Sequence, residues 1–340
     1  MLLEVLIKGN LTEADPQNES ITNAVSQICI CLKDDFKQFL PIFVPALLKD
    51  AQKDIDFKVK DADEFEGKQE EDDPNQAMIL KVKGMEGAKQ VSMNTNALES
   101  KINAMQIIKN LARNLGTAFF EYVEDVAKLC IEKLLNDPYS HTLRKESGKV
   151  MRFLIAACKD YPDKQKALFI MTYMKEMEEL EKRIKRSEFD QTNGILKEIY
   201  KQLKNFLGFK EKGLTVFSQE DATTLVNKLH MIVETIKKDK TDRYAKIKKM
   251  AKHIDEEDMA YFEENLEDVD KGIHHCMEIN GFLMQNQGEQ ISGVVGQTLL
   301  PSYAMTLLDI SGKKDYELVD SVCFICDCME HGNTALFNQI

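Results

Sequence analysis

Apolar side chains recur along this chain at the spacing of amphipathic α-helices almost throughout. Between Pro16 and Leu32 they fall on one stripe, and a second apolar run follows a short acidic break. These runs predict one helix over 21–32 and another over 36–50, the second with prolines near its beginning. Two helices joined by a few residues cannot bury both of their faces alone, so they must pack against neighbouring pairs.

The pattern of paired helices then repeats. The expected pairs are 95–114 with 117–135 (broken at Leu115-Gly116), 140–160 with 163–183, 188–208 with 218–253, and 256–285 with 289–310, followed by a single helix over 314–330. The step between the first two of these pairs is about 44 residues, within the roughly 40–47 residues of HEAT or armadillo repeats. We therefore expect an all-α fold, a HEAT-repeat α-solenoid built from antiparallel helix pairs.

We expect residues 1–340 to form a single solenoid. Residues 1–49 would hold one leading helix, over MLLEVLIKGNL, and the first hairpin. Residues 94–340 would hold further hairpins, the last of them incomplete because FNQI only begins a partner helix. Since a solenoid normally closes with a polar cap, the sequence suggests a piece of a longer stack.

Residues 50–93 interrupt the helical period, and we interpret them as an acidic inserted loop. MILKVKG within them alternates briefly, as a strand does. The acidic side chains of 61–73 favour either a solvated loop or an arm that touches partners. They are Asp61, Asp63, Glu64, Glu66, Glu70, Glu71, Asp72 and Asp73.

A second break in the pattern is a change of charge. Residues 237–253 are basic and residues 255–270 are acidic. Adjacent helices of opposite charge attract, so we expect these two segments to pair with each other.

Composition narrows the function classes. The chain carries 57 acidic against 45 basic residues, which argues against nucleic acid as the main partner. No apolar run approaches the roughly 20 residues of a membrane span, so we expect no membrane partner. Eight irregularly spaced cysteines without a basic, signal-like leader indicate a reducing, cytosolic or nuclear compartment.

No catalytic or metal-binding constellation emerges, so we expect no enzyme, no cofactor and no metal. The phosphate-binding glycine motifs, the G-x-S-x-G elbow and the H-E-x-x-H helix are all missing. CFICDCMEH offers Cys323, Cys326, Cys328 and His331, but on a helix Cys326 and Cys328 point about 200° apart. The neighbours His274, His275 and Cys276 diverge for the same reason. The methionines, Met171, Met174 and Met177 among them, are expected to fill the core.

Several segments, in order, resemble the importin-β superfamily, in particular the branch called importin five or importin-β3. The stretch from Leu2 to Ala51 resembles one of its repeats, with a second helix that begins around Phe-x-x-Phe-Leu-Pro. The acidic segment resembles the loop inserted in that branch, and ALESKINAMQIIKNLARNLGTAFFEYVEDVAKLCIEKLL resembles the next repeat. Lys145-Glu146-Ser147, TLLPSYAMTLLDI and the closing VCFICDCMEHGNTALFNQI resemble later parts.

The resemblance implies a Ran-dependent nuclear import receptor present in cytoplasm and nucleus. Its cargo would be basic proteins such as ribosomal proteins and histones, and its other partners nucleoporins and, for the full-length receptor, Ran GTPase. The second helix of each hairpin would present acidic side chains to lysine-rich signals. The alternative is a generic HEAT scaffold or regulatory subunit, which shares the fold but does not depend on basic peptides.

The expected helix over 117–135 offers such an acidic face. Its buried stripe is predicted to hold Phe119, Val123, Val126, Cys130 and Leu134. Glu121, Glu124, Asp125 and Glu132 are left facing outward. Either a solvated helix face or a cargo site explains them. Glu176 and Glu179, with Glu178 between them, form a weaker candidate on 163–183, partly offset by lysines.

Overall fold

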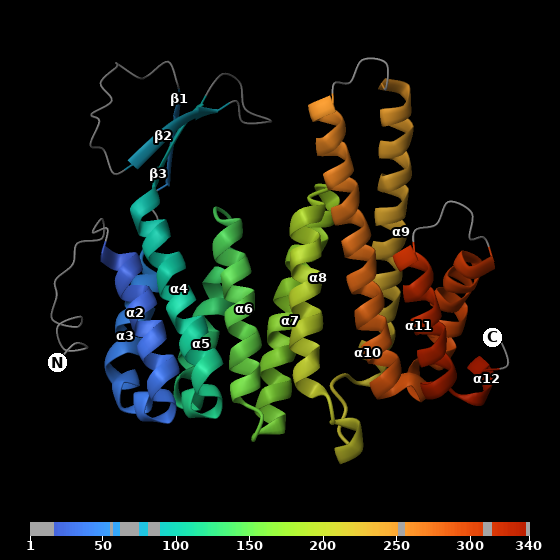
Figure 1. The fold of residues 1–340 in the computed structure, drawn as a ribbon, viewed down its shortest axis with the longest axis horizontal. Coiled ribbons are helices and arrows are strands. Elements are labelled where there is room, and N and C mark those ends of the chain that lie inside the picture. The colour runs from blue at the N-terminus through green and yellow to red at the C-terminus, as the bar shows by residue number, and fades with distance from the viewer. Residues whose placement is uncertain are drawn as a thin grey trace. The chain divides into compact units, whose positions relative to one another are not determined.

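The computed structural model describes residues 17–54, 57–61, 75–80, 89–250, 256–308 and 315–337. The chain divides into two compact units, Met1–Gln165 and Lys166–Ile340. Helices dominate the described ranges of both units (Figure 1). The expected leading helix lies outside the described residues.

The first helix pair is α2 (Gln17–Leu32) with α3 (Leu40–Gln52), joined by the 3-10 helix η1 (Lys33–Phe39). Lys33 adopts a left-handed φ of 47°, which separates α2 from η1. Phe36 of η1 and Val44 of α3 are fully buried. The prediction of helices over 21–32 and 36–50 is confirmed, except that the second begins as a 3-10 turn.

The next pair packs α4 (Thr95–Leu115) against a segment in three parts: η3 (Gly116–Tyr122, 3-10), α5 (Val123–Leu129) and η4 (Cys130–Leu134, a π turn). Gly116 has φ 51°, a conformation that glycine adopts without strain, and it marks the predicted break between the two helices. The segment 117–135, expected as a single α-helix, is helical along its length, but only its middle part is an α-helix.

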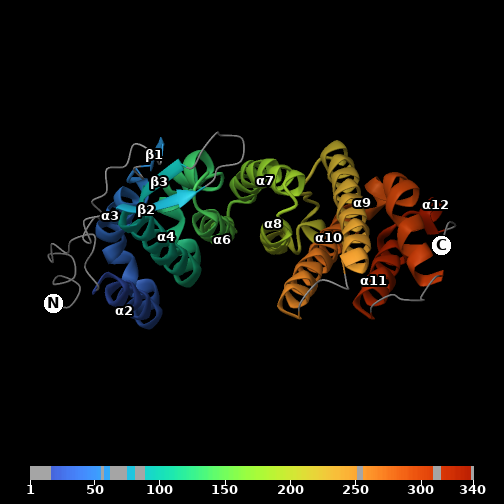
Figure 2. The same ribbon diagram turned by 90° about the horizontal axis from the view of Figure 1, so that it is seen from above.

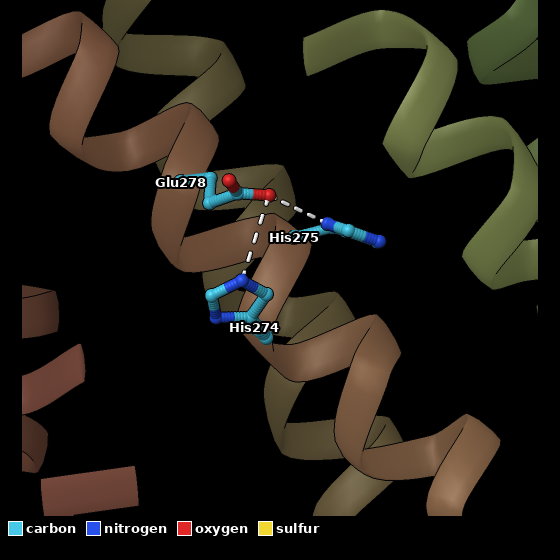
Figure 3. Close-up of side chains that lie close together, drawn as sticks. All are labelled: His274, His275 and Glu278. Carbon is cyan, nitrogen blue, oxygen red and sulfur yellow. Dashed lines mark hydrogen bonds and ion pairs between the residues drawn. The ribbon is translucent and has the colours of Figure 1, made fainter. Parts of the chain in front are cut away.

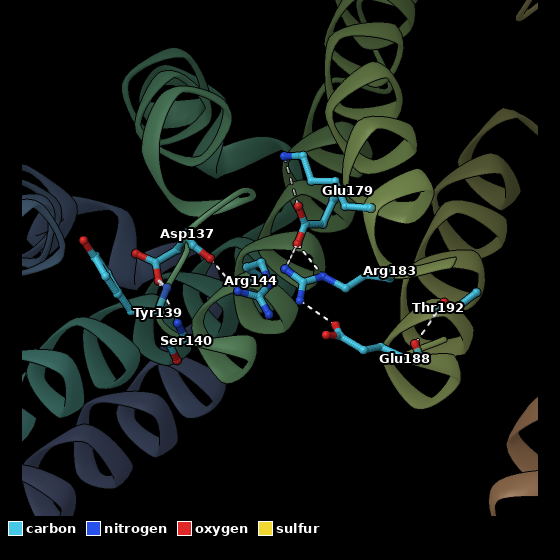
Figure 4. A network of polar contacts seen from close by, with 9 residues as sticks. Asp137, Tyr139, Ser140, Arg144, Glu179, Arg183, Glu188 and Thr192 are labelled. Atoms are coloured by element: carbon cyan, nitrogen blue, oxygen red, sulfur yellow. Dashed lines mark hydrogen bonds and ion pairs between the residues drawn. The ribbon is translucent and has the colours of Figure 1, made fainter. Parts of the chain in front are cut away.

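Helix α6 (His141–Ala157) begins with a side-chain cap. Ser140 Oγ accepts a hydrogen bond from the backbone N–H of Leu143 at 3.1 Å. Asp137 Oδ1 accepts from the backbone N–H groups of Tyr139 and Ser140 (Figure 4). These bonds satisfy donors that a helix start leaves unpaired and so fix where α6 begins.

The described parts of the segment interpreted as a loop form a small sheet. Strands β1 (Phe57–Asp61), β2 (Asn75–Leu80) and β3 (Lys89–Asn94) pair antiparallel in the order β1-β3-β2 (Figures 1 and 2). Val91 of the central strand lies opposite Val59 on one side and Met78 on the other. Strand β2 includes Met78–Leu80, the beginning of the alternating MILKVKG segment whose remaining residues lie outside the described ranges, whereas β1 and β3 were not predicted. Of the acidic residues in 61–73, only Asp61 lies within the described residues, at the end of β1.

The second unit holds most of α7 (Pro162–Lys185), then α8 (Phe189–Leu203), two short 3-10 turns, η5 (Lys204–Phe206) and η6 (Lys210–Lys212), and α9 (Gln219–Met250). Phe169, Phe206 and Phe217 meet in a buried cluster, with ring centroids 5.1 and 5.7 Å from Phe169. This cluster ties α7 to the segment that precedes α9.

The predicted pair over 256–285 and 289–310 is confirmed: the element α10 (Glu256–Leu308) consists of two helices that meet at a kink at Gln287 (φ −138°, ψ 21°). The Gln287 side chain donates to the carbonyl of Phe217 at 2.9 Å, which holds the break against the loop before α9. A Cβ at Gly288 would overlap the carbonyl oxygen of His331, so only glycine lets α11 (Asp315–His331) approach this closely. The last described element is α12 (Thr334–Phe337).

Two smaller predictions have mixed outcomes. Lys240 of α9 pairs with Asp270 of α10 at 2.5 Å, an instance of the expected attraction between the basic and acidic segments. Met177 is buried, as expected, but Met171 and Met174 are more than half exposed. They lie on the outer face of α7, while Phe169 and Leu180 point inward, so the assignment of these two methionines to the core was wrong.

Among the described residues, no helix is both long and apolar enough to cross a bilayer.

Candidate functional site

The predicted division of the 117–135 segment into a buried stripe and an acidic face is confirmed. Phe119 and Val126 are fully buried, and Val123, Cys130 and Leu134 are buried with them. The four carboxylates on the other side are exposed, and we name them the α5 acidic face: Glu121, Glu124, Asp125 and Glu132.

The carboxylates of the α5 acidic face are open to a ligand. Glu121 approaches Lys37 of η1 at 3.8 Å, but both side chains are more than half exposed, so the pair contributes little. Within the described part of the chain, no ion pair or hydrogen bond engages the carboxylates of Glu124, Asp125 and Glu132. Lys128 lies four residues from both Glu124 and Glu132, and Lys133 is exposed beside Glu132, so the four carboxylates still outnumber the lysines of their own segment.

In the same unit, an ion pair with a buried carboxylate joins α4 to α6. Glu146 accepts hydrogen bonds from Lys109 of α4 at 2.7 Å and from Lys149 of its own helix at 2.6 Å. Burial alone would raise the pKa of Glu146, but the two ammonium groups outweigh it and hold the pKa below the usual 4.5. The neighbouring Ser147 hydroxyl donates to the carbonyl of Leu143. The Lys145-Glu146-Ser147 segment therefore has a structural role, which its sequence alone did not indicate.

The candidate acids on α7 occupy a different environment, because Glu176 and Glu179 are both buried. Glu179 forms a close ion pair with Arg183, and Arg183 also bonds Glu188 at 2.6 Å (Figure 4). Lys182 approaches Glu179 from the solvent side at 3.4 Å. This carboxylate is already neutralised inside the unit.

Glu176 accepts a hydrogen bond from Gln202 of α8 at 2.8 Å. Its pKa is raised well above the usual 4.5, mainly because burial disfavours the charged form. Glu178 is exposed between the two and pairs with Lys175 at 3.0 Å. The structure thus brings Glu121, Glu124, Asp125 and Glu132 together at the surface and keeps Glu176 and Glu179 out of reach of a partner.

The cysteines examined as metal ligands do not gather around one point. Cys323 and Cys326 are exposed on α11, whereas Cys328 is buried on its other side, and burial raises the pKa of the Cys328 thiol to about 12. Cys276 is likewise buried, and burial raises its thiol pKa far above the usual 9.0. The Cys276 and Cys328 thiols are thus packed in the core of the second unit.

Known proteins resemble part of this chain in sequence and share its fold. Importin subunit beta-3 of Saccharomyces cerevisiae is 27% identical over 158 residues, which are 46% of this chain and 14% of that protein. The crystal structure of the karyopherin Kap121p bound to the extreme C-terminus of the protein phosphatase Cdc14p matches 99% of this chain and 30% of its own, with a TM-score of 0.68 at 18% identity. The chain is thus similar in sequence to importin subunit beta-3 over part of its length, and similar in fold to the karyopherin Kap121p over nearly all of it.

A second structure of Kap121p, bound to Nup53p, superposes with a TM-score of 0.62 and 17% identity over 99% of this chain and 33% of its own. No family model matches the chain. The predicted HEAT-repeat solenoid and the resemblance to importin-β3 are both confirmed. The chain spans only about a third or less of the length of these relatives.

Proposed function

We propose that this chain is a cargo-binding segment of a nuclear transport receptor and that the α5 acidic face binds lysine-rich peptide segments of the cargo. The observation that carries the proposal is the likeness to Kap121p over 99% of the chain. That karyopherin has been crystallised with the extreme C-terminus of one protein and with Nup53p. A basic segment, from a cargo such as a histone or ribosomal protein, is the partner that an acidic helix face favours.

The physical basis is electrostatic. Each exposed carboxylate–ammonium contact contributes only about 0.2–1 kcal/mol, so affinity depends on several of them acting together. The four carboxylates of the α5 acidic face lie on one helical segment, from η3 through α5 to η4, whose other side is buried. Such a face speeds association by attracting positive charge, and its affinity falls as salt screens the charges.

The same likeness supports movement between cytoplasm and nucleus, with nucleoporins as further partners and Ran GTPase as the release factor of the full-length receptor. The generic scaffold remains the second candidate. It shares the helical stack but predicts no dependence on basic peptides.

Fluorescence anisotropy with a labelled lysine-rich histone-tail peptide tests the proposal at two salt concentrations. We expect saturable binding that weakens with salt. Glu121→Lys/Glu124→Lys/Asp125→Lys should weaken binding at least about tenfold, because three attractive contacts become repulsive.

The matched control is Glu178→Lys/Glu289→Lys/Glu330→Lys. It makes the same change of net charge at exposed positions dispersed over α7, α10 and α11. Binding by the control close to that of the parent would assign the effect to the α5 acidic face. Equal loss in both variants would show only a dependence on net charge, and no binding by the folded parent at low salt would favour the scaffold.

A further inference from the structure

Two neighbouring histidines in α10 face the same carboxylate, one turn further along the helix. His275 Nδ1 lies 2.6 Å from Glu278 Oε2, and His274 Nε2 lies 3.7 Å from the same oxygen. Figure 3 shows Glu278 reaching back to both rings. Consecutive helix residues diverge, as the sequence analysis argued for His274, His275 and Cys276. Glu278 overcomes this divergence because it lies four residues after one histidine and three after the other.

A second carboxylate, from another helix, orients the first ring. Asp320 of α11 lies 2.8 Å from His274 Nδ1, so the other ring nitrogen, Nε2, is turned toward Glu278. A carboxylate on the far nitrogen of an imidazole fixes its tautomer and strengthens it as a ligand, and this arrangement commonly supports metal-binding histidines. Asp320 is largely buried, with 12% of its side chain exposed, so its position is well defined.

The donor atoms have the spacing that a small cation needs. Two imidazole nitrogens and one carboxylate oxygen lie within 4.8 Å of one another. Zinc binds such donors at about 2.0–2.2 Å, which places tetrahedral ligands roughly 3.4 Å apart. The observed 2.6 and 3.7 Å lie on either side of this value, so small side-chain rotations suffice. The site is open on the side of His274, whose side chain is 42% exposed, which leaves room for water as a fourth ligand.

We propose that His274, His275 and Glu278 form a binding site for a zinc-type divalent cation, with Asp320 as the residue that positions His274. Two nitrogen donors and one oxygen donor favour borderline metals such as zinc over magnesium or calcium, which take oxygen ligands. Lys197 of α8 lies near His275 and opposes a cation there, but Glu278 and Asp320 offset it with two negative charges. Bound metal would stabilise α10 directly and α11 through Asp320.

Calorimetric titration of the whole chain with zinc chloride at neutral pH tests this site. The parent for the test carries Cys323→Ser/Cys326→Ser, so that the exposed thiols of α11 cannot bind the metal. We expect one zinc per chain and a rise in the unfolding temperature on adding zinc, because a ligand of the native state stabilises it. Glu278→Gln and His275→Gln should each weaken binding at least about tenfold, and Asp320→Asn should weaken it about tenfold.

His230→Gln on α9 is the matched control and should bind zinc like the parent. Circular dichroism without zinc establishes that each variant is folded. Cobalt in place of zinc provides a second measurement, with visible bands but no thiolate charge-transfer band. No saturable binding by the parent, full binding by folded His274→Gln/His275→Gln, or a thiolate band would each overturn the proposal.

Discussion

The η3-α5-η4 segment and helix α7 each carry two glutamates three positions apart, Glu121 with Glu124 and Glu176 with Glu179, and they place them in opposite environments. On α5 the carboxylates lie away from the apolar stripe and reach solvent. On α7 the buried seam is itself polar, since Thr172, Glu176, Glu179 and Arg183 all lie on it. An acidic helix in a helical stack is therefore not by itself a binding surface, because neighbouring helices can enclose its polar side.

The enclosed acids of α7 are held by specific partners. Arg183 neutralises Glu179, and Gln202 of α8 bonds Glu176. Such groups contribute to specificity of packing, and breaking one partner leaves a charge without compensation. The α5 acidic face has no such constraint, so its carboxylates can change without loss of the fold.

The largest effect should come from removing the buried arginine. Arg183→Leu leaves Glu179 charged and enclosed and should lower the free energy of unfolding by about 3–5 kcal/mol. Urea denaturation measures it. Lys182→Leu, which removes the half-exposed partner of the same carboxylate, should cost no more than about 1 kcal/mol. Equal losses of unfolding free energy in the two variants would contradict the distinction between the buried and the half-exposed partner of Glu179.

Replacing the buried Glu146 should have the second-largest effect on the free energy of unfolding. Glu146→Gln loses two charge-assisted hydrogen bonds and should cost about 1.5–3 kcal/mol at neutral pH. Because the folded-state pKa of Glu146 lies below 4.5, its contribution is present above that pH and is lost as pH falls through the lower value. The difference in unfolding free energy between parent and variant should therefore shrink as denaturation is repeated at lower pH. A difference that stays constant would assign the cost to packing alone.

The contribution of Glu176 to stability should depend on pH in the opposite direction. Its folded-state pKa is raised above 4.5, so the stability of the parent is fully present below that pH and is lost as pH rises through the raised value. Glu176→Gln keeps the shape, can still accept from Gln202 and carries no charge. It should stabilise the protein at neutral pH by about 1 kcal/mol. Thermal unfolding at neutral and acidic pH checks this, and a destabilised variant at neutral pH would show that the carboxylate is charged and well paired.

The smallest effect on stability should come from the α5 acidic face. Glu121→Gln/Glu124→Gln/Asp125→Asn should change the unfolding free energy by no more than about 0.5 kcal/mol, since the side chains are exposed. Binding of the lysine-rich peptide should nevertheless fall and lose most of its salt dependence. A large loss of stability in urea would show that these carboxylates serve the fold.

The sequence predicted the helical elements well, because apolar residues at helical spacing directly report a buried face. It placed the stripe from Phe119 to Leu134 correctly for that reason. It did not predict β1 and β3, because both strands are short and β1 pairs with β3 across the intervening β2, so the local pattern specifies them weakly. It also missed the burial of Glu176 and Glu179, because periodicity assigns polar residues outward and cannot identify Gln202 or Arg183 as partners. The contact of Glu278 with both histidines comes from the next turn of the helix, so the divergence of adjacent residues does not predict it.

The central claim is that the carboxylates of α5 meet the basic ligand and those of α7 do not. Zero-length carbodiimide coupling of a lysine-rich peptide to the chain, with the joined residues identified by mass spectrometry, tests this most directly. The account predicts peptide lysines coupled to Glu121, Glu124, Asp125 or Glu132 at low salt, and no coupling to Glu176 or Glu179. Coupling to the α7 pair, or spread evenly over exposed acids such as Glu178, Glu289 and Glu330, would contradict it.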